Sequence, residues 1–358
     1  MPRAVHQLLA ALAPGDAIST QALLIQSHLR AAGFLSELFA EKVHPKIATR
    51  ARPLWQYAAH AAPGDVWLLH FSIGSAASRL FAALTGRRVL LYHNVTPAEW
   101  FRRYSRELAA QCDEGRRELL TLAQLADLGL GVSEFNRREL EAAGFRRTAV
   151  MPLIPEVRFQ QQRHSRVFRS LLRDGRDNIL FVGRISPNKR IEDLVRVFAV
   201  YQRFVHPASR LLLAGDYRGN ERYHDALLRT VDDLRLDEVV FTGHLEGDDL
   251  RACYAAADVF LCLSEHEGVG VPLLEAMLFG VPVVAWDAAA VRETLRGGGV
   301  LLREKRPEVV AELIELLLRD ARLREAVLAT QRRVVGEIES IDYPRLLLER
   351  LAPVLEAA

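Results

Sequence analysis

The sequence predicts two α/β domains of similar size, each built on a parallel sheet. Short apolar runs alternate with longer amphipathic ones along most of the chain, which is the pattern of strands and helices in such a sheet. The alternation is interrupted by residues 155–177, which are rich in Arg and Gln and poor in apolar side chains, and then restarts. We therefore interpret 155–177 as a connector between two domains.

In the first half of the chain, apolar runs predict strands, and one serine predicts the start of a helix. Ser133 is a residue type that caps helix amino termini, so we expect a helix from there through Ala142. The strands predicted in this half lie at 66–73, 87–93 and 128–132 and near 147–152.

In the second half, the same alternation gives clearer signals, with helices fitting between the strands. The tail from about residue 306 reads as helical, and its last helix is expected at 343–357, where Pro353 could interrupt it. The strands predicted in this half lie at 178–184, 210–215, 239–243, 258–263 and 282–286.

Composition excludes several classes of protein. The 358 residues are 50% hydrophobic and 26% charged, as in soluble globular proteins, and the net charge of +2 gives no reason to expect nucleic acid as a partner. The three cysteines form no metal-binding pair, which argues against structural zinc. The amino terminus makes a poor signal peptide, and no apolar run approaches the roughly 20 residues of a membrane span. The expected location is the cytoplasm, with the inner face of the membrane as an alternative.

The stretch SEHEGVGVPLLEAM, residues 264–277, follows a predicted strand and enters a helix. Gly268 and Gly270 permit unusual backbone angles, and Pro272 suits the first helical position. Val271 has no side-chain oxygen that could cap the helix, so the first amides could bind an anion. The alternative is an ordinary helix start whose amides bind water.

Two carboxylates in this stretch, Glu267 and Glu275, are eight residues apart. Glu275 would lie one turn into the helix, where a carboxylate suits hydroxyl groups such as those of a ribose better than a phosphate. Glu267 lies at the strand end, where open α/β sheets bind ligands. Together they predict a ribose at one carboxylate, a sugar at the other, and a diphosphate between them.

A second phosphate-binding candidate is the segment GRISPNK, residues 183–189, which also follows a strand. Arg184 and Lys189 lie on either side of a turn marked by Pro187 and Asn188. Two cations at a strand end could clamp a diphosphate through charged hydrogen bonds. Taken alone, the segment would read as a solvated basic loop.

These residues together resemble family 4 glycosyltransferases, which are retaining enzymes of GT-B fold. The resemblance is strongest at 181–189 and 257–285 and looser at 13–19, 92–97 and 132–140. It implies two Rossmann-like domains that face a cleft and a final helix that crosses back to the first domain. The implied division is an acceptor-side domain at 1–160, a nucleotide-sugar-binding domain at 161–340 and the crossover helix at 341–358.

The resemblance implies a role for each matching residue. Arg184 and Lys189 match the pair that binds the donor diphosphate and stabilises the leaving group. Glu267 matches the glutamate on the donor sugar hydroxyls, and Glu275 the one on the nucleotide ribose. His93 matches a histidine beside the transferred sugar.

The remaining donor contacts implied by the resemblance are made largely by backbone. They fall at Gly268, Val269 and Gly270 for sugar and phosphate, at Gly15 for the diphosphate, and near His244 and Leu245 for the base. The sequence departs from the family pattern at Asp16, which follows a single glycine where two are common, and at Val269, where an aromatic or polar residue is common. It also has Ala288-Ala-Ala290 where a Gly-Gly pair is usual.

The predicted activity is transfer of a hexose from a nucleoside diphosphate sugar, with retention and without a metal or any cofactor besides the nucleotide sugar. GDP-mannose is the favoured donor, and the acceptor is a hydroxyl of a glycan or lipid-linked molecule in surface polysaccharide or glycoconjugate synthesis. The alternatives are a UDP-glucose or UDP-GlcNAc transferase, another GT-B enzyme such as a nucleotide-sugar epimerase, and a non-catalytic sugar-nucleotide-binding module.

Two features of the first domain stay open at the level of sequence. His70 and Ser72, which end a predicted strand, either line the acceptor side or simply pack. Arginine pairs at 102–103, 116–117, 137–138 and 146–147 could form a basic face for peripheral membrane contact, or they could be solvated helix surfaces.

Overall fold

The computed structural model describes residues 4–153 and 159–356. The chain divides into two compact units. Unit 1 comprises Met1–Glu99, Glu107–Leu153 and Ile341–Ala358, and unit 2 comprises Trp100–Arg106 and Ile154–Ser340. Unit 2 thus includes a short segment from the first half of the chain, Trp100–Arg106. Unit 1 includes the carboxyl-terminal segment that begins at Ile341.

Unit 1 is built on a parallel sheet with the strand order β3-β2-β1-β4-β5-β6-β7. The order runs outward in both directions from β1 and β4, so it reverses between these two strands, as in dinucleotide-binding folds. The strands are β1 (Val5–Leu12), β2 (Leu38–Val43), β3 (Arg52–Pro53), β4 (Val66–Phe71), β5 (Arg87–Tyr92), β6 (Leu128–Gly131) and β7 (Thr148–Val150).

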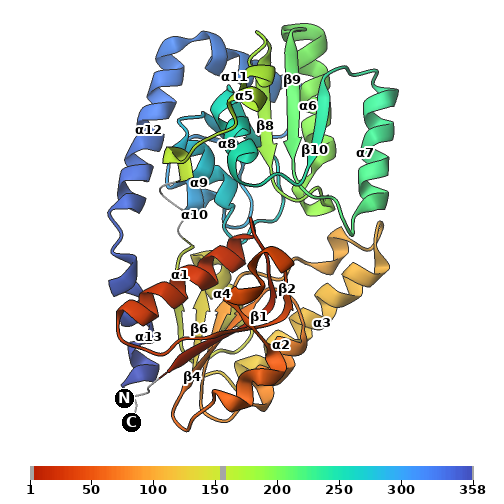
Figure 1. Cartoon of the computed structure of the whole chain (residues 1–358). Helices are drawn as coiled ribbons and strands as arrows, with labels where there is room; N and C mark the ends of the chain where they lie inside the picture. Colours follow the sequence, from red (N-terminus) through yellow and green to blue (C-terminus); the bar gives the residue numbers. More distant parts are fainter. Residues whose placement is uncertain (1–3, 154–158, 357–358) are drawn as a thin grey trace. The chain divides into compact units, whose positions relative to one another are not determined.

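Helices connect the strands of unit 1 (Figure 1). The expected helix after Ser133 is present, and the Ser133 side chain accepts a hydrogen bond from the amide of Asn136. The helices are α1 (Ala17–Ala31), α2 (Ala76–Ala83), α3 (Arg106–Ala123), α4 (Glu134–Ala142) and α13 (Tyr343–Leu355), with short 3-10 turns at Pro45–Arg50, Leu54–Ala59 and Ala98–Trp100.

Unit 2 repeats the same topology, with the parallel strand order β10-β9-β8-β11-β12-β13. Its reversal lies between β8 and β11. The strands are β8 (Asp177–Val182), β9 (Ser209–Ala214), β10 (Val239–Gly243), β11 (Val259–Cys262), β12 (Val283–Trp286) and β13 (Val300–Leu302). The prediction of two Rossmann-like α/β domains is confirmed, and every predicted strand occurs with ends within about two residues.

The helices of unit 2 fill the crossovers between its strands and form its carboxyl-terminal part (Figure 1). They are α5 (Arg166–Leu172), α6 (Ile191–Val200), α7 (Glu221–Asp233), α8 (Gly247–Ala256), α9 (Val271–Leu278), α10 (Val291–Leu295), α11 (Pro307–Arg319) and α12 (Ala321–Glu339). Short turns occupy Phe159–Gln161 and Pro187–Lys189, and α6 ends in a π-helical turn at Tyr201–Val205.

The interpretation of 155–177 as a connector is wrong for its described part. Residues 155–158 lie outside the described residues, but 166–172 form α5, which packs against α8. Ser165 caps α5, and its amide donates to the carbonyl of Asp248 at 3.0 Å. Phe168 and the buried Leu172 are four residues apart, so they share one helix face and reach the core. Two well-spaced apolar residues therefore outweigh the polar composition of the segment.

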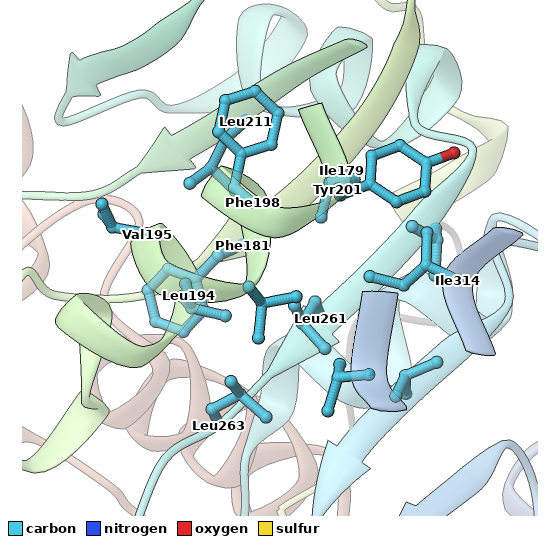
Figure 2. Close-up of a cluster of buried hydrophobic side chains, with 14 of the residues drawn as sticks. Ile179, Phe181, Leu194, Val195, Phe198, Tyr201, Leu211, Leu261, Leu263 and Ile314 are labelled. Carbon is cyan, nitrogen blue, oxygen red and sulfur yellow. The ribbon is translucent and has the colours of Figure 1, made fainter. Parts of the chain in front are cut away.

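One core cluster of unit 2 lies between β8, β9 and β11 and the helices α6 and α11, and another involves α8, α9 and α12. Figure 2 shows Phe181 and Leu261 from the strands beside Leu194 and Phe198 from α6 and Ile314 from α11. All of these side chains are at most 1% exposed. Because the strands are buried on both faces, they read as continuous apolar runs, which made them easy to predict.

The last helix returns to unit 1 and continues past Pro353. Its apolar face buries Leu347, Leu351 and Val354, and Tyr343 packs against His28 of α1. Arg87 donates to the carbonyl of Val354, and Arg350 donates to that of Val150 at 2.9 Å. These contacts hold the helix to unit 1 even though Pro353 cannot donate a backbone hydrogen bond.

Candidate donor-binding site

The candidate site of unit 2 lies at the carboxyl ends of β8 and β11, the neighbouring strands between which the strand order reverses. Ligands of open α/β sheets bind at this point because adjacent loops turn to opposite sides there. The loop after β8 carries Arg184 and Lys189, and the loop after β11 carries Glu267 and Gly270. Sequence reasoning proposed both loops separately, and the topology makes them neighbours.

Asn188 joins the two loops from the inside. Its side chain accepts a hydrogen bond from Ser186 at 2.8 Å and donates to the carbonyl of His266 at 3.2 Å, and its carbonyl accepts from the amide of Glu265 at 2.9 Å. Asn188 and Ser186 are buried, so these bonds stay out of competition with water. The buried network fixes the position of Lys189 relative to Glu267.

Lys189 and Glu267 form an ion pair, with 2.7 Å between Nζ and Oε2. Their side chains are 18% and 11% exposed, so the pair lies in a shallow, partly desolvated position. A cation held by a single carboxylate has donor capacity left for a phosphate. The structure thus brings together the two residues that the sequence assigned to diphosphate and sugar.

Arg184 is exposed, and one of its guanidinium nitrogens donates to the carbonyl of Arg218 at 3.3 Å. Asp216, a nearby carboxylate, accepts a side-chain hydrogen bond from Arg218 and not from Arg184. This hydrogen bond is the main cause that lowers the pKa of the Asp216 carboxyl. Within the described part of the chain, no carboxylate forms an ion pair with Arg184. Its charge is therefore available to an anion.

Helix α9 starts without a side-chain cap, as the sequence predicted. Its N-cap is Gly270, which adopts a left-handed conformation with φ of 85°. The helix begins at Val271, so Pro272 is one position further in than expected. The loop before it is held by Thr294, whose hydroxyl donates to the carbonyl of Val269. This start can present backbone amides to an anion.

Glu275 lies on α9 one turn into the helix, and it accepts a hydrogen bond from the hydroxyl of Tyr254 at 2.6 Å. Burial raises the pKa of the Glu275 carboxyl, and the bond from Tyr254 partly offsets that rise. Tyr254 is fully buried on α8 and packs against Phe279. The tyrosine therefore orients the carboxylate that the resemblance assigns to the ribose.

Lys305 was not among the predicted site residues, but it contacts the loop after β11 through Leu263 and Glu265. Its ammonium lies 2.6 Å from a carboxylate oxygen of Glu265 and 2.8 Å from the carbonyl of Leu263, and it lies over the ring of Trp286. Trp286 also donates to Glu265 at 3.1 Å. The signal was present, since Lys305 is among only a few lysines in an arginine-rich chain, but nothing in the sequence showed its partner.

In unit 1, His93 follows β5 and lies against His70 of β4. The two rings are stacked, and a ring nitrogen of each lies 2.9 Å from the other. Burial lowers the pKa of the His93 imidazole to about 3 and lowers that of His70 well below its ordinary value. Both rings are therefore neutral at physiological pH. His70 is buried within unit 1, with 3% of the residue exposed.

Gly15, the other predicted residue of unit 1, follows β1 with φ of 71°. The next residue, Asp16, caps α1: its carboxylate accepts from the amide of Ser19 at 2.8 Å and from the Ser19 hydroxyl at 2.7 Å. An acidic side chain thus occupies the helix start that could otherwise attract a phosphate. The departure noted at Asp16 has a structural role, and the contact of Gly15 with a diphosphate stays a prediction.

His244 and Leu245 follow β10, on the same carboxyl edge of the sheet of unit 2. His244 is exposed, and Leu245 packs partly buried against the core. In the sheet order, β9 separates β10 from β8. Their assignment to the base of the nucleotide stays a prediction.

The arginine pairs of unit 1 are partly engaged within the unit. Arg116 pairs with Glu139, and both Arg137 and Arg138 pair with Glu134. Arg146 and Arg147 are exposed. The paired arginines fit the reading as solvated helix surfaces, and membrane contact stays a prediction.

Within residues 4–153 and 159–356, neither unit contains a group of three or more metal-ligating side chains placed to hold a metal ion. None of the helices in these ranges is long and apolar enough to cross a membrane.

The fold is that of GT-B glycosyltransferases. Sucrose-phosphate synthase from Thermosynechococcus elongatus superposes with a TM-score of 0.76 at 20% identity, covering 99% of this chain and 100% of that one. HepE from Anabaena, solved in complex with UDP and glucose, gives a TM-score of 0.74 at 20% identity with the same coverage. At this level of identity, the likeness defines the fold and leaves the reaction to the site.

Residues 163–333 match the family described as glycosyl transferases group 1. A GDP-mannose-dependent alpha-mannosyltransferase of Mycobacterium tuberculosis is 31% identical over 235 residues, which are 63% of this chain and 57% of that protein. The O-antigen chain mannosyltransferase B of Escherichia coli is 31% identical over 151 residues, 42% of this chain and 39% of that protein. The similarity thus spans 57% and 39% of the lengths of these two relatives, less than two thirds of either.

Proposed function

We propose that this chain transfers a hexose from a nucleoside diphosphate sugar to a hydroxyl of a glycan or lipid-linked acceptor, with retention at the anomeric carbon. The observation that carries the proposal is the Lys189–Glu267 pair at the reversal between β8 and β11, beside the uncapped start of α9. A cation, a carboxylate and a helix start at one sheet edge suit a diphosphate joined to a sugar. The match to glycosyl transferases group 1 covers this whole site.

The chemistry follows from what each group can do when a donor binds. The diphosphate offers Lys189 a doubly charged partner, so it draws the ammonium away from Glu267. Glu267 then accepts hydrogen bonds from sugar hydroxyls, while Glu275, oriented by Tyr254, accepts from the ribose. The acceptor hydroxyl attacks on the side of the leaving group, and the departing phosphate oxygen takes its proton.

The charge that develops on the leaving diphosphate needs preorganised positive groups. Arg184, Lys189 and the start of α9 supply them, and we propose that they suffice without a metal ion. GDP-mannose is the proposed donor because relatives of this domain are named as GDP-mannose-dependent mannosyltransferases. The product would enter surface polysaccharide or glycoconjugate synthesis. UDP-glucose is the second candidate, since HepE, of the same fold, was solved with UDP-glucose.

Thermal shift against GDP-mannose, UDP-glucose, UDP-GlcNAc and ADP-glucose tests the donor. A ligand at one hundred times its dissociation constant stabilises the folded state by about 2.7 kcal/mol, so one donor should raise the melting temperature clearly above the others. Hydrolysis or transfer assays with that donor then test the reaction. A flat response to all four nucleotide sugars would refute the donor site.

Lys189→Met tests the leaving-group role within the same assay. Loss of one preorganised donor to developing charge lowers kcat by about 100- to 1,000-fold. Arg196→Met is the matched control, because Arg196 forms an exposed ion pair with Asp193 on α6 and should leave turnover unchanged. If both variants turn over at the wild-type rate, Lys189 does not act on the diphosphate.

A further inference from the structure

A chain of hydrogen bonds crosses three neighbouring strands of unit 1 and ends at His93. Gln7 on β1 holds its side-chain oxygen 2.8 Å from Nε2 of His70 on β4, and Nδ1 of His70 lies 2.9 Å from Nε2 of His93 after β5. The strand register places these residues on one face of the sheet, since His70 pairs with Leu9 and with Leu91. The amide nitrogen of Gln7 donates to the carbonyl of Ala22 on α1 at 3.2 Å.

Gln7, the first residue of this hydrogen-bonded series, determines which nitrogen of each histidine carries the proton. The carbonyl of Ala22 only accepts, so the nitrogen of the Gln7 amide must face it and the oxygen must face His70. Nε2 of His70 therefore carries the proton, and in a neutral ring Nδ1 is then an acceptor. His93 must in turn donate to it from Nε2. In the neutral His93 ring, the lone pair is left on Nδ1.

That lone pair has no partner within the described part of the chain, although the Nδ1 atom is buried. An unmade buried hydrogen bond is costly, so a ligand hydroxyl that donated to this nitrogen would gain a bond that the protein itself does not make. The other ring atoms of the pair are satisfied by protein. The hydrogen-bonded series thus ends on a single acceptor atom, Nδ1 of His93. This atom suits a hydroxyl donor and does not suit a phosphate oxygen.

We propose that Gln7 and His70 are positioning residues that hold His93 in its Nε2-protonated tautomer, so that Nδ1 accepts a hydrogen bond from a hydroxyl of the bound sugar substrate. This inference rests on the proposed function for the identity of the hydroxyl donor. It assigns roles to two buried residues, one of which lies in the first strand. The neutral state of both rings, which burial maintains, is consistent with it.

Nitrogen-15 NMR of the histidine side chains in the ligand-free protein reads the tautomer directly. We expect the His93 signal, assigned by its absence in His93→Asn, to show a protonated Nε2 and an unprotonated Nδ1. The measurement needs no substrate, so it stands even if no nucleotide sugar binds. A protonated Nδ1 in the wild-type protein would overturn the inference.

Gln7→Met tests the role of the first member. Without the Gln7 oxygen, His70 can move its proton to Nδ1 and donate to His93, which then carries its proton on Nδ1 and loses the acceptor. We expect the tautomer of His93 to invert and kcat/KM for the donor sugar that gives the largest thermal shift to fall about tenfold or more, the effect of one hydrogen bond. Gln7→Glu keeps an oxygen opposite His70 and should restore the wild-type tautomer.

Gln26→Met is the matched control, because Gln26 is also buried in unit 1 and donates to a backbone carbonyl, that of Ser36, at 3.0 Å. It should lower stability to a similar degree while leaving the His93 tautomer and kcat/KM near the wild-type values. An equal loss of kcat/KM in Gln7→Met and Gln26→Met, with the tautomer unchanged in both, would overturn the positioning role. If the donor still bound to all of these variants, the positioning role would be wrong but the proposed function would stand.

Discussion

Glu275 is a carboxylate that the folded protein holds at a cost in stability. Its pKa is raised above the ordinary value of 4.5, mainly because the side chain is buried, so its charged form is less stable in the folded protein than in the unfolded chain. The cost is absent well below pH 4.5, where the group is protonated in both states, it grows as the pH rises from 4.5 towards the folded-state pKa, and it is complete above that pKa. Such a group is expected where function requires it.

We predict that Glu275→Gln has a higher melting temperature than the wild type at pH 7.5 and the same melting temperature at pH 4. The amide removes the buried charge and can still accept the hydrogen bond from Tyr254. Scanning calorimetry at both pH values measures the difference. Glu337→Gln, which breaks an exposed ion pair with Arg333, is the control and should change little at either pH. A Glu275→Gln variant that is less stable at pH 7.5 would contradict the argument.

For individual residues, the sequence predicted residue types and their spacing better than their partners. The distance between Glu267 and Glu275 correctly placed one carboxylate before the turn and one on the helix. The partner of Glu275 is Tyr254, 21 residues earlier on another helix, and no local pattern indicates that contact. The Lys189–Glu267 pair was likewise hidden, because both residues were expected to face a ligand and not each other.

Among the elements, α9 depends on glycines at both of its ends. Gly270 before the helix and Gly280 after it have φ of 85° and 66°, which are conformations that other residues adopt with strain. A methyl group on Gly270 would also lie 2.9 Å from Leu273, while one on Gly280 would meet nothing within 4 Å. The two positions therefore share the backbone strain and differ in crowding.

We predict that Gly280→Ala lowers the free energy of unfolding by about 1 kcal/mol through backbone strain alone. Gly270→Ala should lose about 1 kcal/mol more through its contact with Leu273. Only Gly270→Ala should weaken donor binding, because only that end of α9 adjoins Lys189 and Glu267. Chemical denaturation and donor titration of the two variants check this, and equal donor affinities would remove Gly270 from the site.

Strands were predicted correctly where burial produces a run of apolar residues in the sequence, and they were missed where it does not. The inner strands β8, β9 and β11 of unit 2 are buried on both faces and appear as apolar runs. Strand β1 lies inside its sheet between β2 and β4, yet it includes the buried polar residues His6 and Gln7 and was not among the predicted strands. Gln7 finds its partner through a tertiary contact with His70, which a sequence pattern does not display.

For the whole molecule, the order of the strands was the decisive fact that sequence could not supply. The alternation of strands and helices predicted two α/β domains, but it gave no order within either sheet. The order places β8 beside β11 and so brings two loops about 80 residues apart in sequence to one edge. The resemblance to a known family anticipated this result, because the family pattern already combines both loops.

The return of the last helix to unit 1 predicts that α13 contributes to the stability of that unit. Leu351 is fully buried on α13, and α13 belongs to unit 1 although it follows α12 of unit 2 in sequence. Leu351→Ala should lower the free energy of unfolding of unit 1 by about 2–5 kcal/mol, as expected for a buried leucine. Leu316→Ala, on α11 and 54% exposed, is the control and should cost less than about 0.5 kcal/mol.

Hydrogen exchange followed by mass spectrometry should show faster exchange in β4 and β5 of the Leu351→Ala protein with β8 and β11 unchanged. Faster exchange confined to β8 and β11 would show that the last helix stabilises unit 2 instead.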